Sequence, residues 1–228
     1  MTGDLKPGKL ITAYRIMLNH FGKRNWWPAD SRFEIMIGSI LVQNTNWKNV
    51  GRCIENLKKE GLMKPEILYG LPVERLAELI KPSGYYNQKV KKIRAFLEFY
   101  RTNSGFSIES MLQKDNEVLR KELLGVFGIG NETADCIMLY ALDKSCFVVD
   151  NYTRRIFSRA GLVSENIRYN TLRAVFTENI PVDVELYKEF HKLIIYLGKE
   201  FCKASMPKCR ICVMRKLCRT GSLNNTNR

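Results

Sequence analysis

Apolar residues recur three and four positions apart along most of the chain, which is the period of an amphipathic helix. The segment at residues 87–103 places five apolar side chains on one helical face: Val90, Ile93, Phe96, Leu97 and Tyr100. The same period predicts further helices at residues 33–42, 47–61, 72–81, 116–124, 132–142, 151–162, 169–180 and 184–201. Strands do not alternate with these helices, although the short apolar run at 146–150 could be extended. The pattern therefore predicts an all-α protein.

Residues with short polar side chains mark the predicted helix starts. Ser31 and Glu34 have the spacing of a capping box before the helix at 33–42. Thr45 or Asn46 can cap the helix at 47–61. Asn131 is expected to cap the helix at 132–142, which leaves Glu132 in its first turn, where the helix dipole favours an anion.

The strongly positive net charge indicates which class of partner the protein prefers. Lys and Arg number 37 against 23 Asp and Glu, so the net charge is +14 and the pI is about 9.5. This excess favours a polyanion such as nucleic acid, although a basic protein with a solvated surface is the alternative. No apolar run reaches the ~18 residues of a membrane span, and the N-terminus lacks the pattern of a signal peptide. We therefore expect a cytoplasmic protein with no membrane partner.

Four of the seven cysteines lie close together near the C-terminus and indicate a metal site. The cluster reads C-x6-C-x2-C-x5-C and consists of Cys202, Cys209, Cys212 and Cys218. Four thiolates at this spacing suit either tetrahedral zinc or a 4Fe–4S cluster. The surrounding segment is basic, which suits contact with phosphate. The remaining three cysteines lie in apolar settings and are expected in the core: Cys53, Cys136 and Cys146.

A glycine turn and a following aspartate are the main candidates for binding and chemistry. The sequence "LLGVFGIG" between two helices predicts a helix-hairpin-helix, in which Gly128 and Gly130 let the backbone approach a phosphate. Asp150 begins "DNYTRR" and can be a helix cap. Alternatively, its carboxylate can stabilise a cationic sugar and activate water beside DNA.

The segments "GIGNETAD" and "VVDNYTRR", followed by the cysteine cluster, resemble the endonuclease III group of the helix-hairpin-helix DNA glycosylase superfamily. The resemblance implies that the four cysteines hold a 4Fe–4S cluster and that Asp150 is catalytic. It implies two helical lobes with a DNA-binding cleft between them. We expect a helical barrel with the hairpin at residues 31–137, and an iron–sulfur cluster domain formed by residues 1–30 and 138–228.

Members of this group that also cleave the DNA backbone carry a lysine two residues after the second hairpin glycine. This chain has Glu132 there, which cannot form a Schiff base. The resemblance therefore implies a monofunctional DNA glycosylase of base excision repair, in which water attacks with help from Asp150. A catalytically idle DNA-binding protein is the alternative from another class.

Two further segments resemble those with which the family handles the flipped nucleotide. "LVQNTNW" matches the segment with a gap-filling glutamine, here Gln43, and "PSGYYNQK" matches the wedge loop, here Tyr85. "NWWPADSRFE" and the tryptophan after "QNT" resemble the base pocket of the 3-methyladenine branch, which places Trp27, Pro28 and Trp47 around the base.

Indole faces attract a positively charged alkylated purine, so 3-methyladenine is the expected substrate. The best-known members of the 3-methyladenine branch lack the cysteine cluster, so uracil or thymine opposite guanine, or hypoxanthine, remains the alternative. The expected partner is double-stranded DNA with a damaged base, bound by a monomer associated with the nucleoid. The remaining expected DNA contacts come from the hairpin and from the basic segment after the aspartate: Gly128, Gly130, Asn131 and Arg154.

Overall fold

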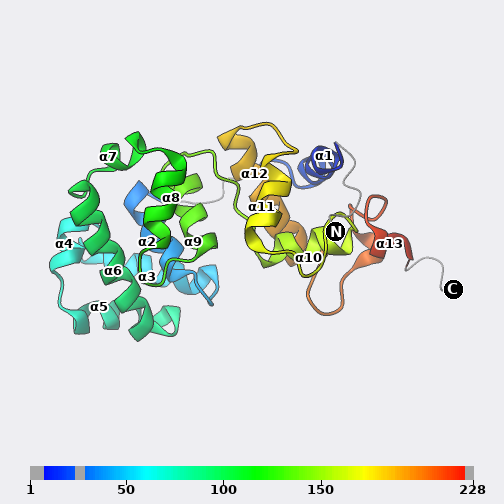
Figure 1. Ribbon diagram of the computed structural model, residues 1–228. Helices are drawn as coiled ribbons and strands as arrows, with labels where there is room; N and C mark the ends of the chain where they lie inside the picture. The colour runs from blue at the N-terminus through cyan, green and yellow to red at the C-terminus, as the bar shows by residue number, and fades with distance from the viewer. Residues whose placement is uncertain (1–7, 24–28, 224–228) are drawn as a thin grey trace. The chain divides into compact units, whose positions relative to one another are not determined.

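The computed structural model describes residues 8–23 and 29–223 as helices joined by turns and irregular segments (Figure 1). No β-strand occurs in these ranges, so the prediction of an all-α protein is confirmed. Within the same ranges, no helix combines the length and the apolar character needed to span a bilayer. The chain divides into two compact units. We call Trp27–Lys144 the hairpin unit, and Met1–Trp26 together with Ser145–Arg228 the cysteine unit.

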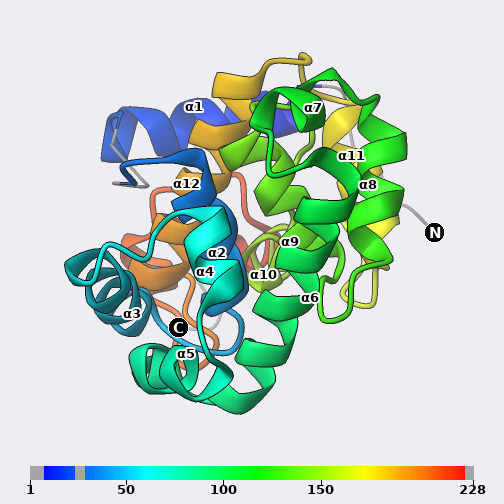
Figure 2. The same ribbon diagram turned by 90° about the vertical axis from the view of Figure 1, so that its left-hand side faces the viewer.

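The hairpin unit is built around α2, which packs against α3, α6, α9 and η2 (Figure 2). Met36, Ile37 and Ile40 on α2 are fully buried, as expected for a helix with neighbours on several sides. The elements of the unit are α2 (Arg32–Leu41), α3 (Trp47–Lys59), α4 (Pro65–Gly70), α5 (Val73–Ile80), η1 (Lys81–Ser83), α6 (Tyr86–Ser104), α7 (Ile108–Gln113), α8 (Asn116–Leu124), α9 (Asn131–Cys136) and the π-helical η2 (Ile137–Ala141).

The predicted caps of α2 and α3 are found, with one difference. The Ser31 hydroxyl accepts a hydrogen bond from the Glu34 amide at 3.1 Å, as in a capping box. The Glu34 carboxylate accepts from the amide of Asp30 at 3.1 Å and pairs with Lys58 at 2.7 Å. The return bond is therefore made one residue earlier than the pattern predicts. Asn46 caps α3, because its Oδ1 accepts from the Asn49 amide at 3.0 Å.

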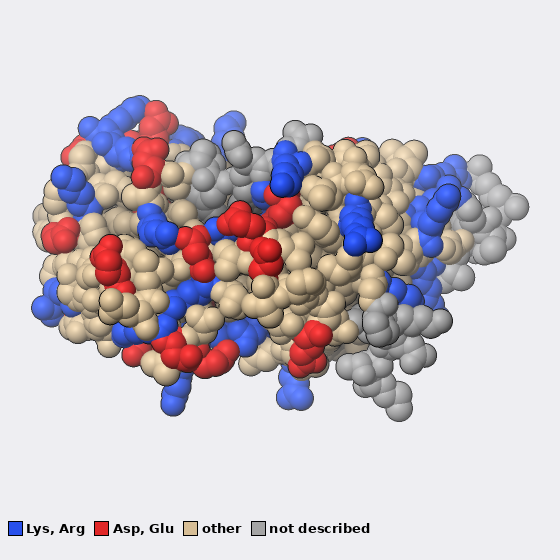
Figure 3. All heavy atoms as spheres, turned by 90° about the horizontal axis from the view of Figure 1, so that it is seen from above, with Lys and Arg blue, Asp and Glu red and all other residues tan. Residues whose placement is uncertain are grey.

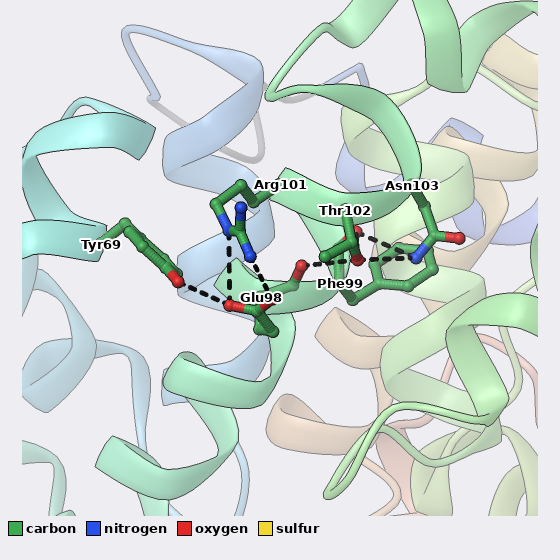
Figure 4. Close-up of polar contacts among 6 residues, drawn as sticks. All are labelled: Tyr69, Glu98, Phe99, Arg101, Thr102 and Asn103. Carbon is green, nitrogen blue, oxygen red and sulfur yellow. Dashed lines mark hydrogen bonds and ion pairs between the residues drawn. The ribbon is translucent and has the colours of Figure 1, made fainter.

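The predicted apolar face of α6 is confirmed, and α4 packs against this helix. All five residues of the predicted face are buried. Figure 4 shows Tyr69 of α4 pointing toward Glu98 and Arg101 of α6. The Tyr69 hydroxyl donates to Glu98 at 2.6 Å, and the Arg101 guanidinium donates to the same carboxylate at 2.7 Å. The hydrogen bond from Arg101, followed by that from Tyr69, lowers the pKa of Glu98.

The cysteine unit is organised around α12 (Val184–Glu200), which packs against α1 (Lys9–Phe21) and α10 (Asn151–Arg159). Aromatic rings fill its core, and the rings of Phe147 and Phe176 stack with centroids 4.3 Å apart. The residues at 145–150 are irregular, and their apolar members are buried. The remaining elements are α11 (Tyr169–Thr177), η3 (Cys209–Ile211) and α13 (Arg219–Leu223).

Candidate functional site

The glycine turn at residues 125–130 joins α8 to α9, so the predicted helix-hairpin-helix is confirmed. Gly128 has a φ of 81°, and a Cβ there would lie 2.2 Å from Cγ of Lys92. Gly130 has an ordinary φ of −93°, and a Cβ there would meet no atom within 4 Å. The fold therefore requires glycine at 128, whereas Gly130 leaves open space before α9 that suits the close approach of a phosphate.

A buried ion pair holds the two helices of the hairpin together. Arg120 of α8 donates from Nε to Oδ1 of Asp135 at 2.7 Å, and from Nη2 to Oδ1 of Asn131 at 2.9 Å. The side chain of Asn131 is thus hydrogen-bonded to Arg120 of α8. Gly130 is the N-cap residue of α9, so the prediction that Asn131 caps this helix is wrong. Glu132 lies in the first turn of α9, as predicted, and is exposed.

The structure places Gln43 against the hairpin. Its Nε2 donates to the carbonyl of Gly128 at 3.0 Å and to Oγ1 of Thr133 at 2.9 Å. Its Oε1 accepts from Nζ of Lys92 at 2.5 Å. Both ends of the amide are therefore engaged within the hairpin unit, so Gln43 and Lys92 brace the turn. The expected role of Gln43, to fill the gap left by the flipped nucleotide, stays a prediction. In that role, Gln43 would have to give up these hydrogen bonds for contacts with DNA.

Tyr85 projects from the turn before α6. It adopts the left-handed conformation with a φ of 47°, and its side chain is 75% exposed. The buried Lys89, one helical turn further on, donates from Nζ to the carbonyls of Leu41 at 2.8 Å and Ser83 at 2.7 Å. Lys89 thus ties the end of α2 to the turn that presents Tyr85. The sequence pattern missed this lysine, because its position in the helix is that of a residue at the edge of the apolar face.

Lys89 is expected to make the unfolding free energy of the protein rise with pH between about 8 and 10.5. Burial lowers the pKa of Lys89 from 10.5 to about 8, so in that window the unfolded chain binds more protons than the folded one. Raising the pH then favours the folded state. Urea unfolding across this window should show a smaller slope for Lys89→Met than for the wild type. Lys91→Met, at an exposed position of α6, is the control; equal slopes in all three proteins would contradict the prediction.

The predicted base pocket is described only in part. Trp27 and Pro28 lie outside the described residues, so their placement stays a prediction. Trp47 is the first residue of α3 and is half-buried. Just before it, Asn44 is exposed with a φ of 54° in the left-handed region. The turn that leads from Gln43 to Trp47 is thus fixed by backbone conformation and by the Asn46 cap.

In the cysteine unit, Asp150 is the N-cap residue of α10. Its Oδ1 accepts from the amide of Thr153 at 2.7 Å and from Oγ1 of Thr153 at 2.8 Å. The Thr153 hydroxyl lies 3.3 Å from the Asp150 amide, which completes a capping box. The other oxygen, Oδ2, lies 3.7 Å from Nε2 of His191 on α12. The cap thus uses one oxygen of Asp150, and the second oxygen faces His191.

The charge state of Asp150 follows from these neighbours. Burial of the carboxyl group acts to raise its pKa, because a charge is poorly solvated there. The neighbouring His191, together with the donors of Thr153, outweighs this effect, and the pKa of Asp150 is lowered. Asp150 is therefore an anion at neutral pH.

Helix α10 connects Asp150 at its start to the cysteine loop at its end. Arg155 donates from Nε to the carbonyl of Cys202 at 2.9 Å. Arg159 donates to the carbonyl of Lys203 at 2.7 Å and lies 3.5 Å from the Cys202 sulfur. Arg154, predicted to bind DNA, is half-buried and makes none of these contacts. The order of the cysteine loop and the placement of α10 are thus coupled.

The four clustered cysteines line one small pocket. Their neighbours there are Arg159, Phe201, Pro207, Arg215, Thr220 and Gly221. Burial raises the pKa of the Cys212 thiol to about 11, and the three other clustered cysteines act in the same direction. In the described part of the chain, no three His, Cys, Asp or Glu side chains are arranged to hold a metal ion. Outside the cluster, Cys53 and Cys146 are buried as predicted, whereas Cys136 is only half-buried.

On at least one face of the molecule, the basic side chains do not form a separate patch. Figure 3 shows a face on which acidic and basic side chains are intermixed. Several basic side chains of the described residues pair with nearby acids, as Arg75 does with Glu60 at 2.5 Å and with Glu78 at 2.6 Å. The net charge therefore supplies a general attraction for a polyanion, and the local site must supply its position.

Comparison with known proteins agrees with this geometry. Residues 37–182 match the family described as HhH-GPD superfamily base excision DNA repair protein. The chain is 44% identical over 206 residues to the "Putative DNA repair glycosylase" of Methanocaldococcus jannaschii, across 90% of this chain and 93% of that protein.

Two solved structures have a similar fold. H. pylori 3-methyladenine DNA glycosylase (MagIII), bound to 1,N6-ethenoadenine, has a TM-score of 0.75 and 27% identity over 84% of this chain and 97% of that one. A trapped endonuclease III–DNA covalent intermediate has a TM-score of 0.80 and 22% identity over 95% of this chain and 98% of that one. The likeness to endonuclease III concerns the fold alone.

The match covers the hairpin, the turn that carries Gln43, and α10 with its N-terminal Asp150. The predicted resemblance to helix-hairpin-helix DNA glycosylases is thus confirmed, and damaged DNA is the partner that this family implies. The chain belongs to the HhH-GPD superfamily of base excision DNA repair proteins.

Proposed function

We propose that the protein is a monofunctional DNA glycosylase that hydrolyses the N-glycosidic bond of an alkylated purine, with 3-methyladenine as the leading substrate. The observation that carries the first part is Glu132. It lies exposed in the first turn of α9, at the position where the lyase members of the group carry lysine. A carboxylate cannot form a Schiff base with the sugar, so water is the attacking group.

The chemistry assigned to Asp150 is that of an anion beside a developing cation. The bond between C1′ and the base breaks, and its electron pair leaves with the base. Water then forms a bond to C1′ and gives its proton to Oδ2 of Asp150, which returns it to solvent. An N3-alkylated purine is positively charged before cleavage and leaves as a neutral base, so no separate acid is needed to protonate it. The lowered pKa of Asp150 supports this role.

The choice of substrate rests on aromatic residues. Trp47, with Trp27 and Pro28, would stack on the flipped base, and an indole face attracts a cationic ring by about 0.5–2 kcal/mol. The similarity to MagIII, which was solved with an ethenoadenine base, supports a modified purine. Neutral lesions gain much less from such stacking, so they would need polar groups that read the edge of the base.

The deciding experiment is a base-release assay with four duplexes. These contain methylated purines, uracil opposite guanine, thymine opposite guanine, or hypoxanthine. We expect release of 3-methyladenine. Release of uracil or thymine instead would replace the substrate assignment with that of a mismatch or deaminated-base glycosylase. If no duplex loses a base but all are bound, the protein is a DNA-binding member of the family without glycosylase activity.

Borohydride trapping tests the monofunctional assignment separately. The wild type should give no covalent protein–DNA adduct, because residue 132 offers no amine. Glu132→Lys places an amine in the first turn of α9 and should yield an adduct that gel electrophoresis resolves. Asp150→Asn in the Glu132→Lys background should lose that adduct. A strong adduct with the wild type would show that another lysine attacks the sugar and would overturn the assignment.

We propose that the cysteine pocket holds a 4Fe–4S cluster. A single metal ion needs all its ligands around one point, whereas a cluster takes one cysteine at each of four separated irons. The four cysteines line one common pocket, so each can reach a different iron of a cluster bound there. Once bound, the cluster would supply covalent cross-links for the loop. Arg155 and Arg159 hydrogen-bond to this loop, so a rigid loop would also fix the position of α10 and of Asp150 at its start.

Cys212→Ser should remove the cluster and lower the thermal stability of the cysteine unit. The wild type, purified without oxygen, is expected to contain about four irons per chain and to absorb near ~400 nm. The variant should lose both signals. Cys136→Ser, which alters a half-buried cysteine of the hairpin unit, is the control and should keep them. One zinc per chain and no visible absorbance in the wild type would contradict the proposal.

A further inference from the structure

The two oxygens of the Asp150 carboxylate have different surroundings. Oδ1 accepts two hydrogen bonds from Thr153 and is used by the helix cap. Oδ2 faces the imidazole of His191, whose Nε2 lies 3.7 Å away. Both side chains are almost fully buried, with exposed fractions of 8% for Asp150 and 6% for His191. The oxygen that is available for chemistry therefore has a titratable neighbour on α12.

A carboxylate buried to this degree stays charged only if neighbouring groups favour its ionised form. Transfer of an isolated anion from water into a protein interior costs several kcal/mol, so the group takes up a proton instead. Thr153 supplies two neutral donors to one oxygen. The imidazole of His191, at ion-pair distance from Oδ2, is a group that can also carry a positive charge.

Other charged groups on the two helices act elsewhere. On α10, Arg155 donates to the carbonyl of Cys202 at 2.9 Å. On α12, Lys192 pairs with Glu189 at 2.9 Å. The same two helices also carry Tyr152, Arg154, Arg159, Glu185, Lys188, Lys199 and Glu200. Burial and Thr153 apart, His191 is the neighbour that acts on the Asp150 carboxyl group.

We propose that His191 is the positioning residue of the Asp150 carboxylate, keeping Oδ2 ionised and oriented toward the attacking water. This inference rests on the proposed glycosylase reaction. His191 touches neither base nor sugar in this scheme and acts through the carboxylate. Without it, Asp150 would be protonated under mildly acidic conditions, and the protein would keep its fold but lose the anion that the reaction requires.

The first test titrates Asp150 in the DNA-free protein and does not depend on activity. Carboxyl carbons of ¹³C-labelled aspartate are followed by NMR, with Asp150→Asn to assign the resonance. In His191→Phe, which keeps a ring but removes the donor and the charge, the titration midpoint of Asp150 should move upward. His20→Asn replaces the second histidine of the chain, which is exposed on α1, and should leave the midpoint unchanged. If His191→Phe fails to fold, His191→Asn takes its place.

The second test measures single-turnover base release as a function of pH. His191→Phe should lose roughly tenfold in rate at pH 5 and recover at pH 8, because each unit below a carboxylate pKa costs a factor of about ten. A uniform loss at all pH values, with an unmoved Asp150 titration, would mean that His191 only packs in the core and would overturn the proposal. A wild type that releases no base would refute the proposed function alone, since the NMR titration still decides the role of His191.

Discussion

Asp150→Asn is expected to lower the rate of base release by about 10²- to 10⁴-fold while leaving the fold and DNA binding nearly unchanged. Asparagine is as good an N-cap as aspartate, so its side-chain oxygen can still accept from the Thr153 amide. The amide carries no charge and cannot stabilise a cationic sugar or accept a proton from water. The loss should appear in single-turnover rates, with affinity for an undamaged duplex measured in parallel.

Two comparisons separate the chemistry of Asp150 from its role in the helix. Asp150→Ala removes the cap as well and should cost about 1 kcal/mol of unfolding free energy beyond the asparagine variant. Asp183 caps α12 in the same unit, with its Oδ1 accepting from the Leu186 amide at 2.9 Å. Asp183→Asn is therefore the matched control and should retain full activity. Wild-type rates in Asp150→Asn would leave Asp150 as a cap only.

The local features of this fold are predictable because they depend on short-range periods. The buried face of α6 and the Asn46 cap of α3 follow from spacing alone. The hairpin also follows, because glycine at 128 meets a positive φ that other residues avoid. The aspartate at the start of α10 suits both a cap and a catalytic carboxylate, and the structure shows that one oxygen serves the cap.

The contacts that complete the site join positions far apart in the chain, so no local pattern encodes them. Gln43 meets the carbonyl of Gly128, and Asp150 meets His191. The wrong prediction that Asn131 caps α9 has the same origin. The Asn131 side chain accepts a hydrogen bond from Arg120 of α8, a contact that local spacing does not reveal. One signal was available for His191. It is one of two histidines in the chain and lies just before the apolar run at 193–197, where a buried polar ring needs a partner.

Asp135→Ala is expected to destabilise the protein by about 3–5 kcal/mol, because it leaves the guanidinium of Arg120 buried without its carboxylate. The side chain of Asp135 is fully buried and that of Arg120 is 8% exposed, so water cannot replace the lost partner. The pair joins α8 to α9 across the hairpin turn, and its loss should weaken DNA binding too. Urea unfolding gives the free energy, and a duplex-binding titration gives the functional effect.

The double variant Arg120→Met, Asp135→Leu tests whether the cost comes from the unpaired charge. Apolar residues of similar volume remove both charges together, so most of the lost stability should return.

An exposed pair provides the matched control. Glu55 and Lys59 on α3 are 60% and 69% exposed, and Glu55→Ala should leave the unfolding free energy nearly unchanged. If Asp135→Ala costs as little as Glu55→Ala, or if the double variant stays as unstable as the single one, the ion pair does not hold the hairpin. Recovered stability with weak DNA binding would instead mean that the polar contact from Arg120 to Asn131 is needed to shape the start of α9.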